Sequence, residues 1–114
     1  RVMEAFKTKD DKVIEDANKE AASVPLTVMQ KALEVLKMIE TVAEKGNENS
    51  ITDAGVAGLM AMAAIEGAGY NVKINLTSIE DKAFVDKLTG EANEIIKEGQ
   101  QIADRIKQRV ESKL

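Results

Sequence analysis

The chain has 114 residues with no cysteine and no histidine, and its 20 acidic and 16 basic residues give a formal net charge of -4. This length holds one domain, and the missing residue types exclude disulfides, thiolate chemistry, imidazole bases and most zinc or di-iron sites. Interspersed charges and 3% aromatic content argue against a nucleic-acid surface. We therefore expect one soluble, cytoplasmic domain that binds neither metal nor nucleic acid.

Helical periodicity dominates the sequence, and the first predicted helical segment covers residues 1–24. No capping residue precedes its first apolar positions, so we expect the chain to begin inside a helix and to lack an N-terminal part. The charged residues 7–12 predict a loop or a frayed turn. The apolar positions that follow at helical spacing are Val13, Ile14, Ala17, Ala21 and Val24.

The only proline, Pro25, predicts the start of a second helix that runs to about Lys45. Proline is tolerated in a first helical turn, where its missing N–H costs little. Gly46 is the predicted C-terminal cap. The apolar residues of this second helix cover a broad part of its surface, which predicts contact with two neighbouring elements. These residues are Leu26, Val28, Met29, Ala32, Leu33, Val35, Leu36, Ile39 and Val42.

A third helix is predicted to follow a polar turn at residues 47–49. Ser50 and Asp53 have the spacing of a capping box, with the aspartate replacing the usual Glu or Gln. Alanine and glycine crowd residues 54–69, which predicts close helix packing. The apolar stretch 54–65 is shorter than the roughly twenty residues that cross a bilayer, so we predict no membrane span. We expect this helix to end near Gly67 or Gly69 and to resume through residues 71–76.

Thr77 or Ser78 is the predicted cap of the last helix. Apolar and small residues there alternate steps of four and three, which is typical of helix bundles; they are Phe84, Leu88, Ala92, Ile95, Gly99, Ile102 and Ile106. The sequence therefore predicts an all-α, up-and-down bundle of long helices.

Asp53 is a candidate for proton transfer, because burial among small residues shifts the pKa of a carboxylate. The simpler interpretation is that it caps the third helix and interacts with the helix dipole. Asn71 and Asn75 would share one helical face with Gly67, and paired amides can bind the edge of a planar heterocycle. The alternative is that Asn71 adopts a left-handed conformation and Asn75 bonds nearby backbone. Lys73, between them in sequence, is a candidate for an anionic group.

Four sequence blocks carry a resemblance to a known family: SVPLTV at 23–28, GNENSITDAGVAG at 46–58, GAGYNVKINL at 67–76 and IEDKAF at 79–84. In this order and spacing they resemble the formiminotetrahydrofolate cyclodeaminase and methenyltetrahydrofolate cyclohydrolase family. The resemblance covers nearly the whole chain and begins at the AF pair of Ala5 and Phe6.

The resemblance implies an all-helical, homodimeric enzyme of one-carbon metabolism whose substrate is a tetrahydrofolate derivative and which needs no further cofactor. One branch of the family cyclises 5-formiminotetrahydrofolate with release of ammonia. Another hydrolyses 5,10-methenyltetrahydrofolate to 10-formyltetrahydrofolate. Both reactions pass through a tetrahedral carbon and need a proton donor or acceptor beside it.

The site implied by the resemblance has two sides, with Asp53 as its catalytic residue. One side consists of Asn47, Asn49, Ser50 and Asp53, and the other of Asn71 and Asn75, with Lys73 as a further candidate for substrate binding. Family members also carry an N-terminal segment with an aspartate that would lie upstream of Arg1, so we expect this domain to be N-terminally incomplete. Two alternatives stay open: a non-catalytic helical dimerisation module and an inactive folate-binding fragment.

Overall fold

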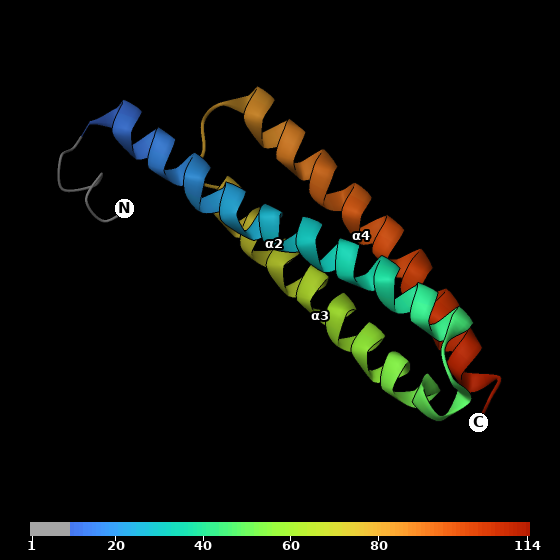
Figure 1. The fold of residues 1–114 in the computed structure, drawn as a ribbon. Coiled ribbons are helices and arrows are strands. Elements are labelled where there is room, and N and C mark those ends of the chain that lie inside the picture. The colour runs from blue at the N-terminus through green and yellow to red at the C-terminus, as the bar shows by residue number, and fades with distance from the viewer. Residues whose placement is uncertain (1–9) are drawn as a thin grey trace.

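The computed structural model describes residues 10–114 and contains three long helices. They are α2 (Asp11–Lys45), α3 (Ile51–Leu76) and α4 (Lys82–Glu111), with the short 3-10 helix η1 (Glu48–Ser50) before α3. Figure 1 shows that α3 runs antiparallel to α2 and that α4 turns back beside both. Each long helix packs on the other two. The predicted all-α, up-and-down bundle is confirmed.

A single helix replaces the first two predicted helices. α2 begins at Asp11, where the Asp10 side chain accepts hydrogen bonds from the backbone N–H groups of Lys12 and Val13. It then continues through Pro25 without a break. The predicted boundary at Pro25 is therefore wrong, as is the loop at its Asp11 and Lys12 end. Residues 1–9, with the rest of that loop and the expected helical start, lie outside the described residues.

Gly46 caps α2, as predicted. Its backbone N–H donates to the Val42 carbonyl at 2.6 Å. Its φ of -77° is not left-handed, so conformational freedom does not explain the glycine here. The reason is space, because a Cβ at this position would collide with the Val42 carbonyl oxygen.

α3 is continuous from Ile51 to Leu76, so the predicted irregularity after Gly67 is wrong. The glycines that suggested it serve packing instead. A Cβ on Gly55 would lie 3.1 Å from Val110, and one on Gly58 would lie 3.2 Å from Ile106. These glycines therefore let α4 approach the α3 backbone closely, which confirms the predicted close packing.

α4 is capped by Asp81, not by the predicted Thr77 or Ser78. The Asp81 side chain accepts from the Phe84 backbone N–H at 3.2 Å. Thr77 instead closes the end of α3, donating from its hydroxyl to the Ile74 carbonyl. The predicted apolar positions of α4 face the core, with Phe84 partly buried and the others buried.

Charged pairs fasten α4 to one side of α2. The Arg105 guanidinium donates from two nitrogens to the two carboxylate oxygens of Glu40, at 2.6 and 3.0 Å. Lys37 lies 3.0 Å from Glu98 in a second ion pair. A row of valines on another part of α2 stays half exposed; it consists of Val24, Val28, Val35 and Val42. α2 thus contacts two helices, as predicted, yet leaves part of its apolar surface uncovered.

α3 exposes large apolar side chains as well as burying them. The segment Glu48–Leu76 is long and apolar enough to cross a membrane by length and composition, a test that core helices of bundles also pass. Only 33% of its most apolar window is buried within this chain. Large side chains stay exposed along it: Val56, Leu59, Met60, Tyr70 and Ile74. The expectation that the chain does not enter a membrane stays a prediction.

Candidate functional site

A groove of 660 Å³ lies between α2 and α3 and contains two of the predicted site residues. Its apolar wall is made of small or β-branched side chains, with Asn71 and Asn75 as its amides. The lining residues are Ala21, Val24, Pro25, Val28, Ala64, Gly67, Ala68, Asn71 and Asn75. We call this the α2–α3 groove. It matches the general pattern of ligand sites, which combine apolar walls with a few polar groups.

Asn75 binds backbone on two helices at once. Its Nδ2 donates to the Ala21 carbonyl of α2 at 3.1 Å and to the Asn71 carbonyl of α3 at 2.9 Å. The Ala21 carbonyl is the one that residue 25 would engage in an uninterrupted helix, and Pro25 has no N–H to offer it. Asn75 therefore replaces the hydrogen bond that Pro25 removes from α2, and this explains how α2 continues through the proline.

The expected alignment of Gly67, Asn71 and Asn75 is confirmed, because all three line the groove. Asn71 is exposed and helical, so the suggested left-handed conformation is wrong. The suggested backbone bonding of Asn75 is confirmed. Lys73 is exposed and is not part of the groove. Two positions away on a helix it is turned by about 200° from either asparagine, so the structure does not bring it to them.

The other predicted residues lie at the opposite end of α3, and we call them the turn cluster: Asn47, Asn49, Ser50 and Asp53. In this turn cluster, Asn47 accepts from the Asn49 backbone N–H at 2.9 Å. Ser50 holds the N-cap position of α3 without a side-chain cap bond, so the predicted capping box with Asp53 does not form. Asp53 lies in the first turn of α3, where its charge interacts favourably with the helix dipole.

Asp53 is exposed, contrary to the expectation of a buried carboxylate among small residues. It is also far from the groove. Because α3 is one straight run of helix, Asp53 and Asn75 are about 33 Å apart at 1.5 Å per residue. One chain therefore does not bring the two sides of the predicted site together, and the assignment of these residues to one site stays a prediction.

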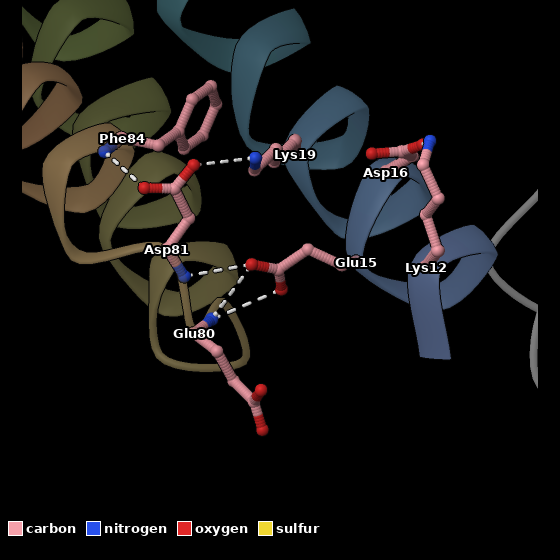
Figure 2. A network of polar contacts seen from close by, with 7 residues as sticks. All are labelled: Lys12, Glu15, Asp16, Lys19, Glu80, Asp81 and Phe84. Carbon is pink, nitrogen blue, oxygen red and sulfur yellow. Dashed lines mark hydrogen bonds and ion pairs between the residues drawn. The ribbon is translucent and has the colours of Figure 1, made fainter. Parts of the chain in front are cut away.

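A polar network fixes the loop between α3 and α4 to the start of α2 (Figure 2). The Glu15 carboxylate accepts from the backbone N–H groups of Glu80 and Asp81, with distances from 2.8 to 3.2 Å. Lys19 donates to Asp81 at 2.7 Å, and its ammonium lies 5.3 Å from the centre of the Phe84 ring.

This network shifts the pKa values of its two ion-paired groups. The hydrogen bond from Lys19, together with the Phe84 N–H, holds the pKa of Asp81 below its ordinary value. The same bond raises the pKa of Lys19. Both groups stay charged near neutral pH, so the network holds the C-terminal end of α3, where Asn75 lies, against α2.

Sequence reasoning missed the part that α2 has in the groove. The sequence pattern predicts a helix boundary at Pro25, and a boundary there gives no reason to expect a side-chain donor for the Ala21 carbonyl. A proline inside a helix always leaves the carbonyl four residues earlier without its usual donor, and Asn75 is the side chain that supplies one. Within residues 10–114 no group of three acidic side chains is placed to hold a metal ion. The expectation of no metal stays a prediction.

The architecture and the groove together define a helical-bundle domain with an amide-lined groove on one face, and comparisons place it in a family. The pattern of the Formiminotransferase-cyclodeaminase family matches residues 1–94. The chain therefore belongs to the formiminotransferase-cyclodeaminase family, as the resemblance in its sequence indicated.

Individual relatives agree with this assignment. The chain is 40% identical over 101 residues to a methenyltetrahydrofolate cyclohydrolase of Methylorubrum extorquens, covering 89% of this chain and 49% of the relative. It is 34% identical over 96 residues to a formimidoyltransferase-cyclodeaminase of Dictyostelium discoideum, covering 84% of this chain and 18% of that protein.

The fold is shared with a solved enzyme. The crystal structure of formiminotetrahydrofolate cyclodeaminase from Thermotoga maritima superposes with a TM-score of 0.93 at 32% identity, covering 97% of this chain and 56% of that one. The chain thus spans about half the length of the Methylorubrum and Thermotoga proteins and a smaller part of the Dictyostelium protein.

Proposed function

We propose that this chain acts in folate one-carbon metabolism, either cyclising 5-formiminotetrahydrofolate with release of ammonia or hydrolysing 5,10-methenyltetrahydrofolate to 10-formyltetrahydrofolate. The family match over residues 1–94 carries the proposal. The α2–α3 groove supports it, because its apolar walls suit a flat ring and its two amides can bind the ring's polar edge. The substrate is the only small molecule required.

In the cyclodeaminase reaction, N10 attacks the formimino carbon and ammonia leaves after protonation. In the cyclohydrolase reaction, water adds to the methenyl carbon and the bond from that carbon to N5 breaks. Both need one group that accepts and returns a proton beside a tetrahedral carbon. We assign this role to Asp53, an exposed carboxylate at the N-terminus of α3.

Asp53 can lie beside the groove only if the aspartate comes from one copy of the chain and the groove from another. We therefore propose a homodimer in which two copies share each site. Exposed apolar residues on α3, among them Val56, Met60 and Ile74, give that helix a face suited to a partner. Midway between Asp53 and Asn75 the small residues Ala63 and Ala64 are exposed, and a Cβ on nearby Gly67 would meet nothing within 4 Å.

A two-fold axis near the middle of α3 would pair this helix with its copy in antiparallel orientation. Such pairing places the turn cluster of one copy beside Asn71 and Asn75 of the other. Asn47, Asn49 and Ser50 would then contribute to binding from the opposite side. Sedimentation equilibrium should give a dimer for the parent chain, and Met60→Lys should shift it toward monomer. A monomeric parent would refute the shared site.

The catalytic proposal is tested with both substrates. Purified chain is added to 5,10-methenyltetrahydrofolate while its near-ultraviolet absorbance is followed, with a matched blank for the uncatalysed hydrolysis. Ammonia is measured separately from 5-formiminotetrahydrofolate. Acceleration of one reaction identifies the branch, and Asp53→Asn should lower it by about 100-fold or more, as expected for loss of an acid-base group.

A matched control separates chemistry from surface charge. Asp104→Asn removes an exposed carboxylate from α4, where its partner is Gln100 on the same helix, and it should leave the rate unchanged. If the parent accelerates neither reaction and binds no reduced folate, the proposal fails, and the exposed apolar face of α3 then favours the non-catalytic dimerisation module. Binding without turnover would instead support a folate-binding fragment.

A further inference from the structure

The orientation of the Asn75 carboxamide is fixed by what surrounds it. Both neighbours of Nδ2, the Ala21 and Asn71 backbone oxygens, can only accept hydrogen bonds. Turning the amide over would place its own oxygen against two carbonyl oxygens, with no hydrogen between them. The NH2 group therefore has to face these carbonyls, and its two hydrogens are both in use.

The other half of the carboxamide is free. No group among residues 10–114 donates a hydrogen bond to Asn75 Oδ1, and none of the buried polar side-chain atoms in that part of the chain lacks a partner. Oδ1 is therefore accessible, on a half-buried residue that lines the α2–α3 groove. What Asn75 offers a ligand is a hydrogen-bond acceptor and not a donor.

This restriction matters because the groove is otherwise mostly apolar. Val24, Pro25, Val28 and Ala64 line it with carbon, so an N–H group brought into it loses its water and needs an acceptor. Asn71 is exposed and its side chain is not held in this way, so it can present either end of its amide. Of the two asparagines, only Asn75 has its amide orientation fixed by the fold, with the NH2 group toward the backbone and the oxygen toward the groove.

We propose that Asn75 is a specificity-determining residue whose Oδ1 accepts a hydrogen bond from an N–H group of the reduced pterin ring. This rests on the proposed folate function and specifies which edge of the ligand meets α3. A reduced pterin carries several N–H donors on its pyrimidine and pyrazine rings. Its carbonyl oxygen, an acceptor, would find no partner at Asn75 and must point elsewhere.

The test has to separate this contact from the support that Asn75 gives to α2. Pro25→Ala provides the background, because it restores an N–H that donates to the Ala21 carbonyl and makes the bond from Asn75 redundant. Asn75→Ala and Asn75→Ser are each made in that background. Binding of 5-formyltetrahydrofolate, a stable reduced folate, is then measured by equilibrium dialysis and compared with Pro25→Ala alone.

Loss of the acceptor in Asn75→Ala should weaken binding by about 10-fold, the value of one hydrogen bond. Asn75→Ser keeps an oxygen that can accept while its hydroxyl donates to the Asn71 carbonyl, so binding should remain within about threefold of the background protein. Unchanged affinity in Asn75→Ala would show a purely structural role and overturn the proposal. Equal losses in both variants would mean that an acceptor at this position does not bind the ligand, and would overturn it too.

A second measurement needs no substitution. In the parent chain the Asn75 side-chain NH2 protons should be protected from exchange with water, and nuclear magnetic resonance should find them still protected after 5-formyltetrahydrofolate is added. Protection lost on binding would mean that the amide releases the two carbonyls to donate to the ligand, which would overturn the proposal. If the parent binds no reduced folate, the proposed function itself fails. If it binds but Asn75 is indifferent, only this inference fails.

Discussion

The link between Pro25 and Asn75 makes a quantitative prediction about stability. Asn75→Ala removes the only side-chain donor that residues 10–114 provide to the part-buried Ala21 carbonyl. One such hydrogen bond contributes about 1 kcal/mol to folding. The bond to the Asn71 carbonyl is more exposed and should contribute less. We expect a total cost of about 1–2 kcal/mol for Asn75→Ala in the parent chain.

The same substitution should cost less when Pro25 is also replaced. In Pro25→Ala, residue 25 supplies a backbone N–H to the Ala21 carbonyl, so losing the Asn75 amide leaves no unpaired group there. The higher helix propensity of alanine over asparagine is the same in both backgrounds and cancels. The double-mutant cycle should therefore give a coupling of about 1 kcal/mol between Pro25 and Asn75.

Urea unfolding followed by helical circular dichroism measures this coupling. All four proteins must be compared at one protein concentration, because the stability of a dimer depends on it. In thermal melts the coupling corresponds to a difference of about 4 °C. Asn71→Ala, one turn earlier on the same helix, is the control. It should change the free energy of unfolding by the same amount with and without Pro25. An equal cost of Asn75→Ala in both backgrounds would refute the account of how α2 tolerates its proline.

Two further predictions concern α4 and its cap. Gly90→Ala should raise the free energy of unfolding by about 0.5–1 kcal/mol, because alanine favours helix and a Cβ there meets nothing within 4 Å. Gly99→Ala should gain clearly less, because its Cβ would lie 3.1 Å from Ile65 Cδ1; equal gains in chemical denaturation would contradict this packing. The pKa of Asp81 lies below its ordinary 3.8, held there by Lys19. The stabilisation is therefore complete above that ordinary value and is lost as the pH falls through the lower folded pKa. Asp81→Asn should flatten the acid side of the stability profile, and an unchanged profile would mean that the ion pair contributes nothing.

Patterns of local spacing predicted most of the fold. The apolar positions of α4, the cap at Gly46 and the close-packed glycines of α3 all follow from neighbours a few residues apart in sequence. The boundaries failed where a distant residue decides them. Pro25 lies inside a helix because Asn75, fifty positions later, supplies the missing donor. α4 begins after Asp81 because Glu15 and Lys19 of α2 hold that loop.

The candidate site divides in the same way. Helical spacing was enough to place Asn71 and Asn75 on one face with Gly67. Helical spacing did not predict how far the two asparagines lie from Asp53, because the predicted interruption of the helix left the distance between them undefined. A continuous α3 fixes that separation along one rigid axis. The proposed pairing of two copies is what allows both groups to belong to one site.

The most direct test of the central claim is a mixing experiment on catalysis. Asp53→Asn and Asn75→Ala chains are each assayed alone, at a substrate concentration well below the parent's KM because Asn75→Ala should weaken binding, then unfolded together, refolded as an equal mixture and assayed again. If two copies share each site, random pairing restores about one quarter of the parent's sites, since half of the dimers are mixed and each has one intact site. Recovery near that fraction is the predicted result. A mixture no more active than the separate variants, or a parent chain without activity on either folate, would contradict the account.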